Sequence, residues 1–334
     1  MTDAVVDRVE EGSPAELELR LPEHRTELTG YCYRMLGSAF DAEDAVQETM
    51  VRAWRSLDRF EGRSQLRSWL YRIATNVCLD MLDGRKRRAR PMDLSSGAWQ
   101  PVQESLAHTQ PEVTWIEPML DGHVIAASAD PAETAVARES VRLAFIAALQ
   151  QLPARQRAVL ILRDVLRWKA EEVATLLESS VASVNSALQR ARATLSTEDR
   201  TDTRHVDPMD EKTAELLGRY VDAFERYDME TLVTLLHEDA TQNMPPYEMW
   251  LQGRDDIITW MVTVGHECRG SRLLATTANG CPAFAQYRPS GPDGKHEPWA
   301  LQVLEISDGR IAAITSFLDT SLFPLLGLPT SLND

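Results

Sequence analysis

The residues best suited to bind another molecule gather between Asp41 and Arg90. A basic run from Arg85 to Arg90 follows a segment rich in aromatic and apolar residues. Arginine and lysine bind phosphate groups, and the planar guanidinium does so with two parallel hydrogen bonds. Residues 43–55 add acids, amides and arginines that share one helix face. This pattern predicts nucleic acid on one side and a protein partner on the other. The alternative interpretation of the basic run is a solvated charged tail.

Candidate acid–base residues lie in the last third of the chain. They are His237, Asp239, Asp255, His266 and His296. General acid–base catalysis needs a proton within hydrogen-bond reach and a tuned pKa, and the sequence specifies neither. The cysteines form no CxxC pair and have no histidine at zinc-ligand spacing, so no metal site is predicted. We therefore expect no enzyme activity and no cofactor.

Two amphipathic helices are predicted to position the residues of the first cluster. The first has Asp41 as its N-cap and buries Ala42, Ala45, Val46, Met50, Ala53 and Trp54. The second begins at Ser64 and buries Leu66, Trp69, Leu70, Ile73, Val77 and Met81. A further helix within residues 17–36 completes an all-α bundle that ends near Arg90.

A helix-turn-helix is predicted between Ala132 and Leu195. Pro153 fits the first position of a helix, and Ser180 fits the cap of the last one. The buried stripe of that last helix is Val181, Val184, Leu188, Ala191 and Leu195. Its outward positions are small, hydrogen-bonding or basic, as insertion into a major groove requires. Glu178 occupies the turn, where a left-handed backbone costs on the order of 1 kcal/mol.

Bulk properties limit the classes of protein. The 334 residues predict two or three domains, and the net charge of −16 confines nucleic-acid binding to local patches. No stretch is apolar enough to span a membrane, and the N-terminus is no signal peptide, so a cytoplasmic protein is expected. Residues 1–15 are predicted to be a disordered leader, 91–131 a linker and 198–209 a hinge. Trp99 and Trp115 of the linker are expected to pack on a neighbouring domain.

Residues 210–334 predict an α+β domain. Helical spacing recurs around Leu216–Phe224, Leu232–Leu236 and Ile257–Val262. Four strand-like segments follow at 271–278, 282–289, 299–307 and 311–318, broken by turn residues such as Asn279-Gly280. Helices first and an antiparallel meander afterwards are typical of this fold class.

The ordered set DAEDAVQETMVRAW, W-L-x-x-I-A-x-N-x-x-x-D and LPARQRAVLILRDV with SVASVNSALQRARATL resembles regions 2 and 4 of extracytoplasmic-function RNA polymerase sigma factors. The resemblance implies two all-α domains, residues 16–90 and 132–197, that bind core RNA polymerase (its β′ and β subunits) and promoter DNA. It implies a linker that threads toward the polymerase active-site cleft. The implied polymerase contacts are Glu43, Asp44, Gln47, Glu48 and Arg52. The implied minus-ten contacts are Arg72, Asn76, Asp80, Arg85, Lys86, Arg87 and Arg88. The implied minus-thirty-five contacts are Ser183, Asn185, Ser186, Gln189 and Arg190.

The stretches YVDAFERYDMETLVTLLHEDATQNMPP and WALQVLEISDGRIAAITSFLD resemble SnoaL-like polyketide-cyclase domains of the nuclear-transport-factor-2-like cone fold. That fold implies a pocket, for which the candidates are Tyr247, Trp250, Trp260, Tyr287, Trp299 and Phe317. Each of them fits an ordinary core aromatic at least as well. We expect the domain to modulate sigma activity, by binding a small molecule or by docking on the sigma domains. Two alternatives stay open: a helix-turn-helix regulator without sigma activity, and a C-terminal cyclase- or isomerase-like enzyme.

Overall fold

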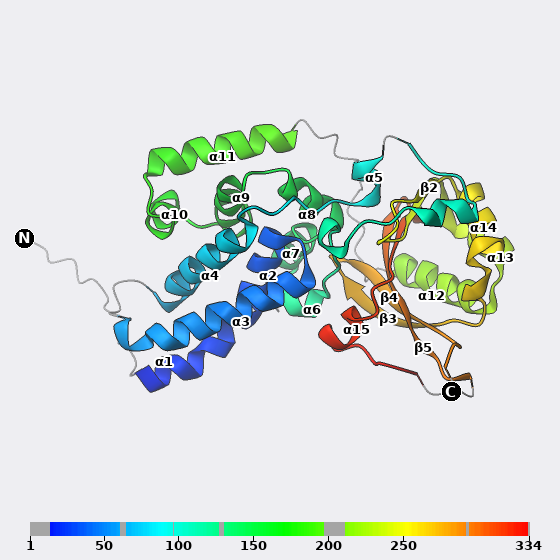
Figure 1. Cartoon of the computed structure of the whole chain (residues 1–334), viewed down its shortest axis with the longest axis horizontal. Coiled ribbons are helices and arrows are strands. Elements are labelled where there is room, and N and C mark those ends of the chain that lie inside the picture. The colour runs from blue at the N-terminus through cyan, green and yellow to red at the C-terminus, as the bar shows by residue number, and fades with distance from the viewer. Residues whose placement is uncertain are drawn as a thin grey trace, which may run out of the picture.

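The computed structural model describes residues 14–60, 65–95, 97–126, 130–196, 211–291 and 294–332. Figure 1 shows a helical half, formed mainly by residues 14–90 and 130–196, beside an α+β half that contains the sheet. The predicted leader up to residue 13 and the predicted hinge at 198–209 lie outside the described residues. Within the described ranges, no helix is long and apolar enough to cross a membrane.

The first bundle consists of α1 (Pro14–Arg20), the 3₁₀ turn η1 (Leu21–His24), α2 (Arg25–Leu36), α3 (Ala39–Ser56), η2 (Leu57–Arg59) and α4 (Leu66–Leu82). Helix α2 is buried from Leu28 to Leu36 because α3, α4, α6 (Asp121–Val124) and α8 (Leu143–Gln150) all pack against it. The Tyr31 and Tyr71 rings meet edge to face at 5.2 Å. The predicted all-α bundle is confirmed.

The start of α3 differs from the prediction. Ser38, and not Asp41, is the N-cap, because its Oγ accepts a 3.0 Å hydrogen bond from the Asp41 backbone N–H. The Asp41 carboxylate is thereby left to accept from arginines that follow α4. Helix α4 likewise begins at Leu66, whereas Ser64 lies outside the described residues.

Trp54 was expected in the core, and this prediction is wrong: 58% of Trp54 is exposed. An α-helix turns about 100° per residue. Relative to Ala42, Met50 therefore lies about 80° away and Trp54 about 120° away. Burial follows that angle, since Ala42, Ala45 and Ala53 are buried and Met50 is half-buried.

The second bundle contains α7 (Pro131–Glu139), α8 (Leu143–Gln150), α9 (Ala154–Leu160), the π-helical η5 (Ile161–Val165), α10 (Ala170–Leu176) and α11 (Val181–Ser196). Pro153 is the N-cap of α9 and not its first residue. The Ser180 cap is confirmed, because its Oγ accepts from the Ser183 backbone N–H at 3.1 Å. The predicted stripe of α11 is buried except for half-buried Val181.

The linker is largely ordered. It contains α5 (Pro91–Leu94), η3 (Gln103–Ala107), η4 (Glu112–Thr114) and α6 (Asp121–Val124). In Figure 1 this cyan-to-teal segment leaves α5, runs to the α+β half and returns. Trp115 is buried beside Ala89, and the Trp99 backbone N–H donates to the Trp250 carbonyl at 2.8 Å. Both tryptophans therefore pack on a neighbouring domain, as expected.

The C-terminal half contains α12 (Glu211–Arg226), α13 (Met229–Leu235), α14 (Arg254–Val262), η6 (Val264–Cys268) and α15 (Leu322–Leu325). Its strands are β1 (Leu236–Asn243), β2 (Trp250–Gln252), β3 (Arg272–Ala278), β4 (Cys281–Arg288), β5 (Glu297–Ser307) and β6 (Arg310–Phe317). Their order in the sheet is β2-β1-β6-β5-β4-β3. The four predicted strands are confirmed, and they form the expected antiparallel meander β3-β4-β5-β6. Two strands were not predicted: β1, which pairs parallel to β6, and β2, which pairs antiparallel to β1. Leu236, expected in a helix, begins β1.

Both faces of the sheet are covered. Phe284 faces the helices of the cone, whereas Ala283, Ala285 and Tyr287 on the same strand belong to the core that extends into the helical half. Strand β4 is consequently buried on alternating sides along nearly its whole length. The two halves of the molecule therefore share one hydrophobic core.

Candidate nucleic-acid interface

One face of α4 carries the candidate minus-ten residues. Arg72, Asn76 and Asp80 are four residues apart, so they lie in a row along the helix, and all three are exposed. Asp80 accepts from Arg52 of α3 at 3.4 Å. This row continues into the exposed side chains of Arg85, Lys86 and Arg87. Six of the seven candidates therefore have exposed side chains.

Arg88 does not belong to that surface. Its side chain is 8% exposed and donates to the Asp41 carboxylate at 2.7 Å, to the Trp115 carbonyl at 2.6 Å and to Glu117 at 3.3 Å. Burying an arginine costs free energy unless it is paired and hydrogen-bonded, and here it is both. Arg88 therefore fastens the linker to α3 and is not available to DNA in this arrangement. Arg85 of the basic run also donates to the Asp41 carboxylate, at 3.0 Å, but its side chain stays exposed.

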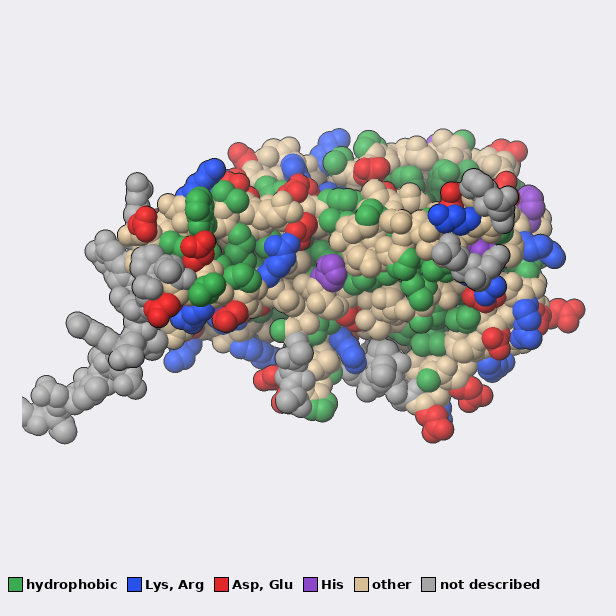
Figure 2. Space-filling model, turned by 90° about the horizontal axis from the view of Figure 1, so that it is seen from below, with side chains coloured by type: hydrophobic (Ala, Val, Ile, Leu, Met, Phe, Trp, Pro, Cys, Tyr) green, Lys and Arg blue, Asp and Glu red, His purple; other side chains and the backbone are tan. Residues whose placement is uncertain are grey.

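The outward face of α3 carries the candidate polymerase residues. Asp44, Gln47, Glu48 and Arg52 are exposed, and half-buried Glu43 is paired with Arg25. Sequence reasoning missed two residues of this face, Val51 and Trp54, which are 39% and 58% exposed. The Trp54 indole N–H donates to Glu18 of α1 at 3.1 Å. At the left of Figure 2, hydrophobic side chains stand exposed among acidic and basic ones. An exposed aromatic within a charged surface is typical of a protein interface.

The five candidate minus-thirty-five residues all lie exposed on α11. The Arg190 guanidinium donates to Ser186 Oγ at 2.7 Å, so the two side chains are already aligned on one face. Arg192, two residues further along α11, is instead paired with Asp164 at 2.6 Å. The geometry provides hydroxyls, amides and one arginine for base edges and phosphates.

Glu178 adopts the left-handed conformation that the turn requires, with φ of +49°. We expect Glu178→Gly to raise the free energy of unfolding by about 1 kcal/mol, because glycine takes this conformation without a Cβ clash. Loss of the Glu178 carboxylate reduces this gain in stability only slightly, because the side chain is 81% exposed and lies 3.9 Å from Arg72. Urea unfolding followed by circular dichroism measures the difference. Unchanged or lower stability would contradict strain at this turn.

The two DNA-facing units are packed against each other. The Tyr71 ring of α4 lies 5.0 Å from the ring of Trp168, which stands two residues before α10. The Arg67 guanidinium covers both rings at 5.1 and 5.3 Å and pairs with Glu27 at 2.7 Å. We call this packing of α4 against the helix-turn-helix the closed arrangement.

Two buried arginines connect α2 of the first bundle to the second bundle. Arg34 of α2 donates to Ser140 Oγ at 2.7 Å, and Arg157 of α9 donates to the Met35 carbonyl. Burial lowers the pKa of each arginine to about 10, so both remain charged at neutral pH. Their hydrogen-bond partners are carbonyl, hydroxyl and amide oxygens. Burying these charges carries a desolvation cost that weakens the closed arrangement.

The turn between β3 and β4 joins all three parts of the chain. Asn279 is fully buried, and its Nδ2 donates to Tyr33 Oη at 2.6 Å and to the Val141 carbonyl at 2.7 Å. Its backbone N–H donates to the linker carbonyl of Met119 at 3.0 Å. The Gly280 N–H donates to Asp121 Oδ1 at 2.8 Å. Asn-Gly suits this turn because both residues have positive φ, +55° and +68°.

A second set of bonds holds the linker on the loop after β1. The Gln110 backbone N–H donates to the Pro246 carbonyl at 3.1 Å, and the Glu248 N–H donates to the His108 carbonyl at 3.0 Å. The Trp250 indole donates to Ser95 Oγ at 2.7 Å. Tyr247 pairs with Thr109 of the linker across an isolated bridge. Tyr247 and Trp250, which were expected to line a pocket, therefore lie against the linker instead.

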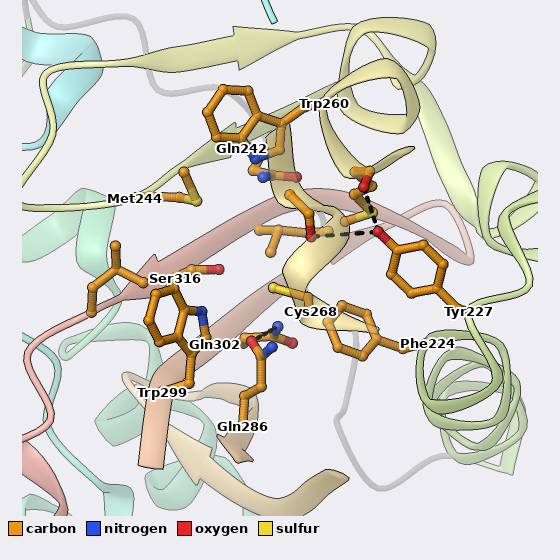
Figure 3. A pocket seen from close by; sticks show the side chains of 14 residues that line it. Phe224, Tyr227, Gln242, Met244, Trp260, Cys268, Gln286, Trp299, Gln302 and Ser316 are labelled. Carbon is orange, nitrogen blue, oxygen red and sulfur yellow. Dashed lines mark hydrogen bonds between the residues drawn. The ribbon is translucent and has the colours of Figure 1, made fainter. Parts of the chain in front are cut away.

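The cone contains a cavity, but few of the predicted aromatics line it. Trp260 and Trp299 do, together with Phe224 and Tyr227, which sequence reasoning missed. Tyr287 points to the other side of the sheet, where its hydroxyl donates to the Pro329 carbonyl at 2.9 Å, and Phe317 lies in that same core. Successive side chains of a strand point to opposite faces of the sheet. Gln286 faces the cavity (Figure 3), so its neighbour Tyr287 faces away from it.

The candidate acid–base residues lie away from the cavity. His237 is half-buried and Asp239 is exposed near the start of β1. Asp255 is exposed on α14, and His266 is exposed in η6. His296 is buried elsewhere, with Nε2 3.0 Å from the Gly270 carbonyl oxygen. Within the described residues, the cavity is lined by no carboxylate or imidazole.

Comparisons with known proteins identify the same three parts of the chain. Family models match Sigma-70 region 2 over residues 22–88, Sigma-70 region 4 over 142–195 and a SnoaL-like domain over 217–314. The chain is 46% identical over 315 residues to the ECF RNA polymerase sigma factor SigG of Mycobacterium tuberculosis, covering 92% of this chain and 83% of that protein. It is 26% identical over 316 residues to SigJ of the same organism, covering 90% of each. The crystal structure of M. tuberculosis SigJ matches 95% of this chain with a TM-score of 0.57 at 23% identity, which shows a shared fold.

The two helical units and the cone domain define a transcription initiation factor of the sigma-70 type with a C-terminal SnoaL-like domain. The chain belongs to the extracytoplasmic-function RNA polymerase sigma factors, which bind core RNA polymerase and direct promoter-specific initiation. The alternative of a helix-turn-helix regulator without sigma activity is therefore wrong.

Proposed function

We propose that the linker and the C-terminal domain hold this sigma factor in the closed arrangement, and that initiation requires it to open. The outward face of α3, including Val51 and Trp54, binds the β′ subunit. The minus-ten element is bound by Arg72, Asn76, Asp80, Arg85, Lys86 and Arg87. The minus-thirty-five element is bound by Ser183, Asn185, Ser186, Gln189 and Arg190.

The observation that carries the proposal is the contact between Tyr71 and Trp168, whose ring centroids are 5.0 Å apart. The names minus-ten and minus-thirty-five place the centres of the two promoter elements roughly 25 base pairs apart. At 3.4 Å per base pair this is about 85 Å of duplex. One rigid unit in which α4 touches the helix-turn-helix cannot bind both elements on such a duplex. The domains must separate before both can engage the promoter.

The linker supports the same conclusion. It is fastened at one end by Arg88 and at the other by the Asn279–Gly280 turn. A linker that threads into polymerase has to leave both anchors. Core polymerase and the C-terminal domain therefore compete for the same segment, and the tether gives the intramolecular contact a high effective concentration.

Asp121 makes the docking sensitive to pH. Burial raises the pKa of Asp121, and it also raises the pKa of Glu117, the acid beside Arg88. A carboxyl with a raised pKa in the docked form binds protons more tightly there than in the released form. Docking is therefore strengthened as the pH falls through the raised pKa, and this gain is lost as the pH rises.

We expect Asp121→Asn to weaken the apparent affinity for core polymerase a few-fold at neutral pH. Asparagine keeps the acceptor for the Gly280 N–H but removes the cost of burying a charge, so the closed fraction rises and the affinity falls in proportion to the open fraction. Fluorescence anisotropy of labelled protein with core polymerase measures it. Glu104→Gln, which removes an exposed carboxylate of the same linker, is the control. Equal affinities for the two variants would contradict the proposal.

A further inference from the structure

The chain contains one Asn-Gly dipeptide, Asn279-Gly280, and it forms the turn between β3 and β4 that contacts the helical half. Asparagine is chemically labile, above all before glycine, which has no Cβ to hinder attack on the side-chain amide. In this reaction the Gly280 nitrogen bonds to Cγ of Asn279, the bond from Cγ to Nδ2 breaks, and ammonia leaves. Water then opens the cyclic imide to aspartate or its β-linked isomer. The interdomain turn therefore carries the sequence of this chain that is most reactive toward spontaneous deamidation.

The docked turn holds the reactive amide on other partners than the Gly280 nitrogen. Asn279 is fully buried, and its Nδ2 donates to Tyr33 Oη at 2.6 Å and to the Val141 carbonyl at 2.7 Å. Its Oδ1 accepts from the Met119 N–H at 3.1 Å. Rotation of the amide toward the attacking nitrogen would break these three hydrogen bonds inside the protein, where unpaired polar groups are costly.

The attacking nitrogen is held as well. The Gly280 N–H donates to Asp121 Oδ1 at 2.8 Å, and even a Cβ added at Gly280 would collide with the Arg138 carbonyl oxygen. The backbone of the docked turn thus has little space in which to shift toward an imide ring. Deamidation has to wait until the turn undocks, so its rate follows the undocked fraction of the molecules.

The product of the reaction does not fit the docked site. A carboxylate oxygen in place of Nδ2 would face the Val141 carbonyl oxygen and Tyr33 Oη, and the Tyr33 hydroxyl already donates to the Glu117 carbonyl at 2.8 Å. The Asp121 carboxylate beside the turn adds repulsion between like charges. Burying a charge in front of hydrogen-bond acceptors costs free energy, and the β-linked isomer would also lengthen the backbone of the turn. The deamidated turn therefore stays undocked.

We propose that Asn279 is a deamidation site that makes opening irreversible. Docking protects the amide, whereas a molecule that stays open converts to a form that cannot close again. The reaction consumes water and releases ammonia, so it needs no further reactant. This inference rests on the proposed closed arrangement and adds a chemical memory to it, because the deamidated sigma factor keeps the activity of the open form after core polymerase releases it.

A variant with a second Asn-Gly pair separates the effect of burial from that of backbone conformation. Asp308→Asn creates such a pair at the β5–β6 turn, where both residues are exposed. The φ angles of that turn, +49° and +72°, match the +55° and +68° of Asn279-Gly280. Mass spectrometry of tryptic peptides measures both reaction rates in the same full-length molecules at mildly alkaline pH. We expect position 279 to react about tenfold more slowly than position 308, and saturating core polymerase to accelerate position 279 about fivefold without affecting position 308.

Transcription tests the consequence of deamidation. Asn279→Asp, which installs the carboxylate of the product, should raise promoter-specific transcription about fivefold. Gln252→Glu, which adds a carboxylate at an exposed position of β2, should leave transcription unchanged. Equal reaction rates at positions 279 and 308, no acceleration by polymerase, or equal transcription by the two variants would each overturn the proposal. The reaction rates decide the matter even if Asn279→Asp does not fold.

The closed arrangement is tested separately from the deamidation. If a covalent link between α4 and the helix-turn-helix blocks initiation, but polymerase leaves the reaction rate at Asn279 unchanged, the closed arrangement stands and only the deamidation site is rejected. If the linked protein initiates fully, the closed arrangement is rejected and this inference with it.

Discussion

Replacing Gly280 with alanine is expected to raise promoter-specific transcription roughly five- to thirtyfold. A Cβ at this position would lie 2.4 Å from the Arg138 carbonyl oxygen, a backbone atom that cannot move aside freely. The turn must therefore withdraw from the helical half. Weakening the docking by about 1–2 kcal/mol changes the ratio of open to closed protein by that factor. Single-round run-off transcription with core polymerase and a cognate promoter measures it.

Gly309 offers a matched control. It occupies the second position of the β5–β6 turn with φ of +72°, close to the +68° of Gly280, but a Cβ there meets nothing within 4 Å. Gly309→Ala therefore introduces the same backbone strain without a collision with the helical half. Transcription should stay at the level of the unmodified protein. If Gly280→Ala and Gly309→Ala behave alike, the turn does not hold the domains closed.

Charge reversal on α11 is expected to have the largest effect in the opposite direction. Arg190→Glu should reduce transcription at least tenfold, because it removes an exposed cation from the recognition helix and places a carboxylate against phosphates or guanine edges. Affinity for core polymerase should not change. Promoter binding by the polymerase complex, measured over a salt series, should also show a smaller salt dependence.

Arg226→Glu serves as the control for that experiment. Arg226 is equally exposed but lies on α12 of the C-terminal domain, away from α11. It should leave transcription unchanged, since the protein as a whole is acidic and local patches carry the phosphate contacts. Full activity of Arg190→Glu at a promoter that depends on its minus-thirty-five element would contradict the assignment of α11.

Sequence patterns identified the helices well because each buries a stripe that repeats with the helical period. The Ser180 cap and the buried Val184, Leu188 and Ala191 of α11 follow directly from spacing. Spacing alone does not decide whether a residue at the edge of a stripe is buried. Trp54 is apolar and was counted in the stripe, yet it lies about 120° from Ala42 around the helix, where it stays 58% exposed beside Glu18 of α1.

Residues whose role depends on distant partners could not be predicted. Arg88 is one of several like charges in a run, and its burial depends on Asp41 and Glu117, which lie far from it in sequence. Tyr287 and Trp299 are both strand aromatics, and only the pairing register decides which one faces the cavity. Strand β1 has the sequence LHEDATQN, in which apolar and polar residues do not alternate, so it carried no strand signal. Asn279-Gly280 was recognisable as a turn but not as an interdomain contact.

Locking the closed arrangement tests the central claim most directly. The Arg72 and Glu178 side chains approach within 3.9 Å across the two DNA-facing units, and they are 49% and 81% exposed. A protein carrying Arg72→Cys and Glu178→Cys can be joined there by a short bismaleimide that contains a reducible disulfide. We predict that the joined protein fails to initiate at a promoter that needs both elements, and that reductant restores the activity of the same sample to that of the unjoined double variant. Full initiation while the link is intact would contradict the claim that the two units must separate.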